Sequence, residues 1–366
     1  MRILYFAPIP YGIMKQRPQY HAQQLAREHE VIYVEPTVSA MKYLLKGGEK
    51  PGGHQYAAET NLQVVRLNGV LSAHRSLQAV AKAFYAWEKL QLRKYLKNAD
   101  LVWVGYSPWY DLIRDFDGPI VYDKMDDDLQ ITKNSLLRRL IRRTEPALTK
   151  RADLIFVTAQ IFAEQLAKQG KEAVVLPNAM DKKQVLTPKQ KRETTETKRV
   201  FGYIGMLAHW VDLDAIRVVL EADPRNHVVL VGPEEIERIE HERIQYIGYV
   251  PKEQVGEWIE RFDVCLYPFA RTDFLDTIDP VKIYEYLAAN KPVLAARSRE
   301  IEKFGNLAVS YGDPDELRQA LSRETFEAPF ASMAERDAFV EENNWDERGN
   351  RILHQIRLIL EKKKIM

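Results

Sequence analysis

Short runs of β-branched and aromatic residues alternate with longer amphipathic segments along almost the whole chain of 366 residues. In the first half the pattern predicts strands at 3–7, 31–35, 64–67, 101–105, 120–123, 154–158 and 174–176, with helices near 18–28, 76–97, 133–150 and 160–169. The second half predicts strands at 200–205, 228–232, 245–248, 264–268 and 293–296, with helices near 212–221, 252–261, 280–289, 314–322 and 331–341. Alternating strands and helices indicate βαβ units and parallel sheets. Because there are two series, we predict an α/β chain of two doubly wound, Rossmann-like domains that face a central cleft.

The polar stretch 181–199, rich in Lys, Thr and Glu, is typical of a connection between domains. We therefore expect a first domain over residues 1–180 and a second over 195–344. Residues 345–366 have a broad apolar face and carry three successive lysines near their C-terminal end. Positive charge is favourable at a helix C-terminus. This pattern predicts a terminal helix that packs back on the first domain.

Several classes of protein are disfavoured by composition. The single cysteine, Cys265, allows no internal disulfide, and no Cys/His cluster has zinc-binding spacing. No apolar run approaches the ~18–20 residues of a bilayer span, and no export signal is visible, so we expect a cytoplasmic protein. Residues 1–180 carry 25 Lys and Arg against 18 Asp and Glu, a modest excess that fits an anionic partner or an ordinary surface. We expect no nucleic-acid partner.

In open α/β sheets, ligands bind beyond the carboxyl ends of the strands. The first predicted strand runs into Ala7-Pro8-Ile9-Pro10-Tyr11-Gly12, which lacks the G-x-G-x-x-G pattern of dinucleotide binding. No phosphate loop of the G-x-x-x-x-G-K-[ST] type occurs in the chain. The sequence therefore disfavours NAD enzymes and P-loop NTPases.

The segment 277–293 is the most informative part of the chain. Asp279 is a good N-cap residue, Pro280 suits the first helical position, and Asn290 can end the helix in a left-handed conformation. Lys282 then lies in the first turn, where a cation opposes the helix dipole by about 0.3–1 kcal/mol unless an anion is bound there.

Phosphate would suit this helix start, because backbone N–H groups of Val281 and Lys282 and the lysine ammonium all favour an anion. Glu285, three residues further on, lies on the same face and can accept two hydrogen bonds from a ribose diol. A nucleoside diphosphate satisfies both groups. In the alternative interpretation, Asp279 itself caps these donors and neutralises Lys282, which leaves Glu285 as an exposed helical residue.

Other candidate ligand contacts lie at neighbouring strand ends. Tyr267 ends one buried strand, Tyr249 follows another, and Gly205 ends the first strand of the second half, with His209 shortly after it. A glycine at such a place allows a ligand to approach the backbone closely. For Tyr267, packing in a half-buried position is an alternative of similar weight.

Pro280–Val293 reads P-x-K-x-x-E-Y-L-A-x-x-x-P-V, which resembles the nucleotide-binding stretch of the family 4 GT-B glycosyltransferases. Over most of its length the chain resembles the teichuronic-acid biosynthesis glycosyltransferases, and 267–286 is also similar to the xanthan glucuronosyltransferase. The resemblance implies a GT-B fold whose C-terminal domain binds a UDP-sugar, with Lys282 and Glu285 as UDP ligands. It also implies a lipid-linked glycan acceptor, with glucuronic acid as one candidate sugar, and no cofactor.

The chain departs from the family pattern at three positions. Thr277 stands where the E-x7-E motif has its first glutamate, and Met206 and Val211 stand where a phosphate-binding arginine and lysine are expected. These departures shift diphosphate binding onto Lys282, with His209 or Arg271 as further candidates. They also leave open whether the anomeric centre is retained or inverted.

Sugar transfer needs an activated acceptor hydroxyl, and for an inverting enzyme we expect the base to be Asp126 or Asp127, beyond the strand 120–123. Alternatively, these aspartates form a solvated loop that caps the next helix. No D-x-D metal motif has a suitable setting, so we expect a metal-independent mechanism. Gly12 and Arg17 are candidates for the acceptor or diphosphate side, although helix packing is the favoured role of Arg17.

Two basic and apolar segments, 41–46 and 133–151, are consistent with peripheral binding to an anionic membrane, as a lipid-linked acceptor would require. An ordinary surface helix is the alternative for 133–151. Two other functions remain open at this stage. A sugar-nucleotide epimerase of the same fold would need no acceptor, and a nucleotide-sugar-binding protein at the membrane would have no catalysis.

Overall fold

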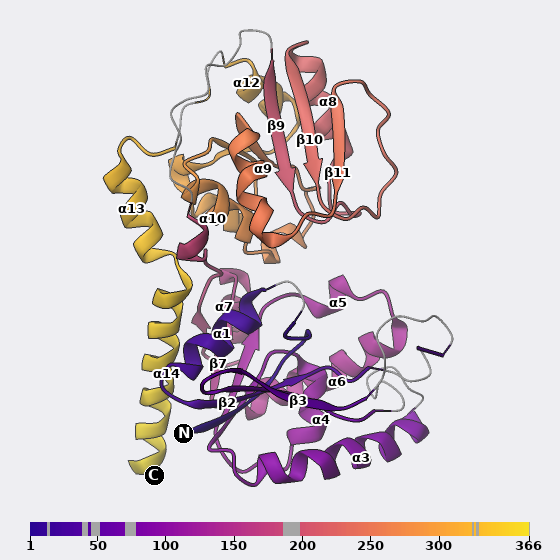
Figure 1. The fold of residues 1–366 in the computed structure, drawn as a ribbon, viewed down its shortest axis with the longest axis vertical. Helices are drawn as coiled ribbons and strands as arrows, with labels where there is room; N and C mark the ends of the chain where they lie inside the picture. The colour runs from indigo at the N-terminus through magenta and orange to yellow at the C-terminus, as the bar shows by residue number, and fades with distance from the viewer. Residues whose placement is uncertain are drawn as a thin grey trace. The chain divides into compact units, whose positions relative to one another are not determined.

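The computed structural model describes residues 1–12, 15–38, 43–44, 52–69, 78–185, 198–323, 326 and 329–365 (Figure 1). The chain forms two compact units. Unit 1 consists of Met1–Pro177 and Arg348–Met366, and unit 2 consists of Asn178–Glu347. Most of the predicted connection, residues 186–197, lies outside the described residues.

Unit 1 contains an eight-stranded sheet in the order β3-β4-β2-β1-β5-β6-β7-β8. The strands are β1 (Arg2–Phe6), β2 (Glu30–Glu35), β3 (His54–Glu59), β4 (Leu62–Arg66), β5 (Leu101–Val104), β6 (Ile120–Lys124), β7 (Leu154–Val157) and β8 (Val174–Val175). Seven of these strands run parallel, and β3 pairs with β4 in the antiparallel direction. The sequence did not predict β3, because this edge strand is mostly exposed and has no apolar run.

Helices cover both faces of this sheet. They are α1 (Arg17–Ala26), α3 (Gln78–Leu96), α4 (Tyr110–Ile113), α5 (Asp128–Ile131), α6 (Ser135–Arg151), α7 (Gln160–Ala167) and most of α14 (Trp345–Ile365). Successive residues of β1 alternate between two cores, with Leu4 in one and Tyr5 in the other. Ile352 and Ile356 of α14 are fully buried in the core that contains Tyr5, so the terminal helix packs on unit 1.

Unit 2 contains a six-stranded parallel sheet in the order β11-β10-β9-β12-β13-β14. The strands are β9 (Arg199–Ile204), β10 (Asn226–Val231), β11 (Ile244–Gly248), β12 (Val264–Tyr267), β13 (Val293–Ala296) and β14 (Val309–Tyr311). The helices are α8 (Leu213–Ala222), α9 (Val255–Arg261), α10 (Val281–Ala288), α11 (Arg299–Glu302), α12 (Pro314–Leu321) and α13 (Met333–Glu342). Numbered within the unit, the strand order is 3-2-1-4-5-6, that of a Rossmann fold. Its topological switch point lies between β9 and β12, where a ligand is expected.

Backbone hydrogen bonds join the carboxyl ends of β9, β10 and β11. The Gly205 N–H donates to the Val231 carbonyl (2.9 Å), and the Gly232 N–H donates to the Gly248 carbonyl (2.8 Å). Gly232 has φ +145°, and a Cβ atom there would overlap the Gly205 carbonyl oxygen. Only glycine fits at 232, and its absent side chain lets the strand ends lie this close together.

We predict that Gly232→Ala lowers the free energy of unfolding of unit 2 by about 3 kcal/mol or more, because it combines unfavourable backbone angles with a backbone overlap. Gly305→Ala is the matched control. Gly305 also has a positive φ (53°), but an added Cβ would meet open space, so we expect a loss of only about 1–2 kcal/mol. Urea unfolding of both variants measures the difference, and equal losses would contradict this account.

Candidate functional site

The helix α10 begins without a side-chain cap. Its N-cap residue is Pro280, and the Asp279 carboxylate does not accept a hydrogen bond from the first turn. Instead, Asp279 is buried, pairs with Lys303, and accepts hydrogen bonds from the Asn178 backbone N–H and the Tyr284 hydroxyl (3.3 Å). The prediction that Asp279 caps this helix is therefore wrong. The alternative interpretation, in which Asp279 fills the anion site, fails for the same reason.

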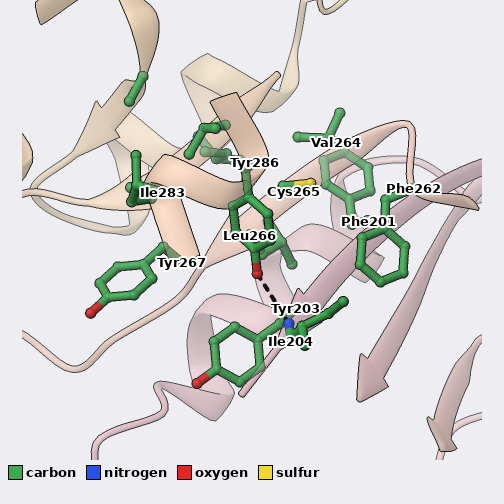
Figure 2. Close-up of a cluster of buried hydrophobic side chains, with 14 of the residues drawn as sticks. Phe201, Tyr203, Ile204, Phe262, Val264, Cys265, Leu266, Tyr267, Ile283 and Tyr286 are labelled. Atoms are coloured by element: carbon green, nitrogen blue, oxygen red, sulfur yellow. Dashed lines mark hydrogen bonds between the residues drawn. The ribbon is translucent and has the colours of Figure 1, made fainter. Parts of the chain in front are cut away.

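The other end of α10 follows the prediction. Asn290 has φ +53°, so it ends the helix in the left-handed region. Between the two ends, the buried Tyr286 hydroxyl accepts a hydrogen bond from the Ile204 backbone N–H (3.0 Å), as Figure 2 shows. Because Ile204 is the last residue of β9, this bond fixes α10 against the strand end at the switch point.

Glu285 lies between two lysines. Its Oε2 atom accepts from the Lys282 ammonium (2.9 Å), and its Oε1 atom accepts from Lys252. The Glu285 side chain is only 10% exposed. Burial raises the pKa of Glu285, but the two ammonium groups outweigh that effect and hold its pKa at about 2. Glu285 is thus a buried carboxylate that stays ionised, and the alternative of an exposed helical residue is wrong.

Lys252 is the residue of this cluster that the sequence analysis missed. It begins the short 3-10 helix η4 (Lys252–Gln254), four residues after Gly248 at the end of β11. The available signal was its position, because the carboxyl ends of parallel strands lie at one edge of the sheet. Its distance of 33 residues from Glu285 hid the pairing.

The other predicted residues of unit 2 differ in exposure. Tyr267 is buried and stacks on Phe269 with ring centroids 4.1 Å apart, as its packing alternative predicts. Tyr249 is 66% exposed, and the exposed His209 contacts Trp210 edge-on. A stacking ligand could therefore reach Tyr249 but not the faces of Tyr267.

Apolar side chains stand at the two positions where the family pattern has a phosphate-binding arginine and lysine. Met206 is 37% exposed, and Val211 is buried and forms a bridge with Phe269. Arg271 donates to the Gly312 carbonyl (2.6 Å). Within this cluster the Val281 backbone, Lys282 and Lys252 are the groups that can meet an anion.

In unit 1, Arg17 is buried and bonded to other groups of the protein. It donates to both carboxylate oxygens of Asp123 (2.8–3.2 Å) and to the Leu176 carbonyl (2.8 Å). His21 also contacts Asp123, at 3.1 Å. Burial, with a smaller contribution from the charge of Arg17, lowers the pKa of His21 to about 4. The ring is therefore neutral at pH 7. The arrangement favours the packing role of Arg17, whereas Gly12 is exposed.

The three aspartates beyond β6 have different environments. Asp127 caps α5, because its side chain accepts from the backbone N–H groups of Leu129 (3.1 Å) and Gln130 (3.2 Å). Asp126 is exposed. Burial, followed by the charge of Asp126, raises the pKa of Asp128 to about 8. Asp128 was not among the predicted site residues, since the different environments of three successive aspartates are not visible in the sequence.

No group of three or more His, Cys, Asp or Glu residues within the described ranges is arranged to hold a metal ion. Among the same residues, no helix combines the length and the apolar character that crossing a bilayer requires.

Part of unit 2 matches the model of a known family. Residues 198–324 match the family model described as "Glycosyl transferases group 1". Over these residues unit 2 is similar to a glycosyl transferase group 1 domain. Over 172 residues the chain is 23% identical to TuaH of Bacillus subtilis (strain 168), described as a teichuronic acid biosynthesis glycosyltransferase. That alignment covers 43% of each chain, so it spans less than half of the relative's length.

Solved structures share the fold of the whole chain. HepE from Anabaena, crystallised with UDP and glucose, matches with a TM-score of 0.67 at 13% identity, covering 98% of this chain and 99% of its own. The UDP-forming α,α-trehalose-phosphate synthase from Burkholderia xenovorans matches with a TM-score of 0.66 at 13% identity, covering 97% and 99%. These matches confirm the predicted α/β, GT-B fold class.

We predict that Glu285→Gln lowers the free energy of unfolding at pH 7 by about 2–3 kcal/mol, because it removes a buried carboxylate shared by two ammonium groups. The pKa of Glu285 is about 2 in the folded protein, below its ordinary value of 4.5. Its contribution is therefore complete above about pH 5, and it falls as the pH drops from there towards 2. Urea unfolding of both proteins between pH 8 and 4 measures this loss. A difference that grows below pH 5 would contradict the assignment.

Proposed function

We propose that the protein is a glycosyltransferase that moves a sugar from a UDP-sugar to a lipid-linked intermediate of cell-wall or extracellular polysaccharide synthesis. The observation that carries the proposal is the uncapped start of α10, where Lys282 and the buried Glu285 lie together in a glycosyl transferase group 1 domain. The UDP complex of HepE supports a UDP-sugar as the donor, and the description of TuaH as a teichuronic acid biosynthesis enzyme supports a role in polysaccharide synthesis.

In this proposal each group of α10 has a distinct part in binding. Lys282 and the backbone N–H groups of the first turn, Val281 included, bind the diphosphate. Glu285 accepts hydrogen bonds from the ribose hydroxyls, for which its low pKa keeps it ionised. Gly205 allows close backbone approach, and the exposed Tyr249 offers a ring for contact with the donor.

For the reaction, the acceptor hydroxyl oxygen forms a bond to the anomeric carbon, and the bond from that carbon to the diphosphate oxygen breaks. UDP leaves with the electron pair, and Lys282 and the helix dipole stabilise its charge without a metal ion. In an inverting reaction the acceptor proton passes to Asp126, since the Asp127 carboxylate caps α5. In a retaining reaction the leaving phosphate takes that proton. Glucuronic acid remains a candidate sugar.

We predict that Lys282→Ala weakens UDP binding by about 1.5–3 kcal/mol, the scale of a charge-assisted hydrogen bond. Isothermal titration calorimetry with UDP measures the change. Lys182→Ala is the control, because Lys182 forms an exposed ion pair with Glu341 in the same unit. Equal UDP affinity of wild type and Lys282→Ala would contradict the assignment.

We also propose that α5 and α6 bind the anionic cytoplasmic face of the membrane that holds the acceptor. Ile131 and Leu136 are 45% and 44% exposed, and Lys133, Arg139 and Arg142 are exposed beside them in sequence. Three other arginines of the basic segment have hydrogen-bond partners within the protein. Arg138, Arg143 and Arg151 donate to Thr132, Asp111 and Gly118 respectively. Most of the second predicted segment, 41–46, lies outside the described residues.

We predict that the protein sediments with phosphatidylglycerol vesicles more than with phosphatidylcholine vesicles, and that Leu136→Ser with Arg139→Ser reduces this binding severalfold. Leu90→Ser with Lys94→Ser, on α3, is the matched control, since Leu90 is 59% exposed. Equal sedimentation of the two double variants would contradict the role of α6.

A further inference from the structure

Lys282 alone does not carry enough positive charge to balance a diphosphate in the proposed nucleotide site. A terminal phosphate carries about −1.5 to −2 at pH 7, and a diphosphate adds a further negative group. Lys282 supplies one positive charge, and Glu285 offsets it at 2.9 Å. Met206 and Val211 contribute no charge. A diphosphate therefore calls for a further cation at this site.

We propose that Lys252 is that cation, so that Lys252 and Lys282 bind the diphosphate from two sides. The inference rests on the proposed function, because it extends the same donor site. Lys252 reaches the cluster from η4, beyond the carboxyl end of β11, whereas Lys282 belongs to α10. Their ammonium groups contact different oxygens of one carboxylate, Oε1 and Oε2 of Glu285. The two cations are thus held close together before any ligand arrives.

The ammonium groups have hydrogen-bonding capacity left for phosphate. Each ammonium has three N–H donors, and within the described residues Lys252 and Lys282 each donate to Glu285. Their side chains are 17% and 25% exposed, so both are shielded but within reach of a ligand. A carboxylate has about four lone-pair sites, so Glu285 can hold both lysines and still accept from ribose hydroxyls.

A purely structural ion pair does not explain the arrangement. One lysine is enough to neutralise Glu285, whereas the cluster of two lysines and one glutamate has a net charge of +1. The two ammonium groups, which share one carboxylate, also repel each other. Lys282 also lies in the first turn of α10, where the helix dipole adds about half a positive charge. This excess positive charge is unfavourable in the protein without a ligand and becomes favourable once an anion binds.

The test compares ligands that share the nucleoside but differ in phosphate. We expect Lys252→Ala to weaken UDP binding at least tenfold in calorimetry and to change uridine binding, followed by saturation-transfer NMR, less than twofold. Lys252→Arg keeps the charge and should restore most of the UDP affinity. Lys182→Ala is again the control, and UDP binding to Lys252→Ala should depend less steeply on salt.

Each other result has a definite meaning. Equal UDP affinity of Lys252→Ala and wild type would overturn the role of Lys252 and leave the proposed function intact. Equal weakening of UDP and uridine would also overturn it, because Lys252 would then act only by positioning Glu285. Failure of the wild-type protein to bind UDP would overturn the proposed function itself, and this inference with it.

Discussion

The ionised carboxylate of Glu285, held between Lys282 and Lys252, is the interaction on which the candidate site depends. Burial alone would raise its pKa and favour a neutral acid, but the two ammonium groups reverse that effect. The same carboxylate gathers two cations that would otherwise repel each other. The site therefore combines a hydrogen-bond acceptor and an excess of positive charge near the start of one helix, the two features on which the proposed binding of a nucleoside diphosphate rests.

The strand order of unit 2 makes this interaction available. Parallel strands bring the ends of β9, β10 and β11 to one edge, and the switch point between β9 and β12 places α10 beside them. Two local contacts then hold these strand ends and α10 close together. Gly232 lets its strand end approach the Gly205 carbonyl, and the Tyr286 hydroxyl joins α10 to Ile204. A ligand at this edge would thus meet groups from several strands without a long loop having to order.

The sequence predicted most of the fold, because burial imposes a periodic pattern on strands and helices. Two strands were not predicted. One is β3, an exposed edge strand whose residues need no such pattern, and the other is β14, an edge strand of only three residues. Within the site, the left-handed Asn290 and the pairing of Lys282 with Glu285 along one helix face follow from local spacing. Asp279 shows where local reasoning fails. It has the residue type and position of a cap, but Lys303, Tyr284 and Asn178 take its carboxylate.

The sequence by itself determined the two α/β units and, within one residue, the start of the helix at Pro280, and it predicted Lys282 and Glu285 as site residues, since all of these depend on neighbours a few residues apart. Only the tertiary structure decided that Lys252 joins them, that Asp279 is occupied elsewhere, and that Asp127 caps α5 whereas the pKa of Asp128 is raised. The physical reason is the range of the forces. Helix and strand periodicity is a local property, whereas ion pairing and burial depend on which distant segments the fold brings within a few ångströms.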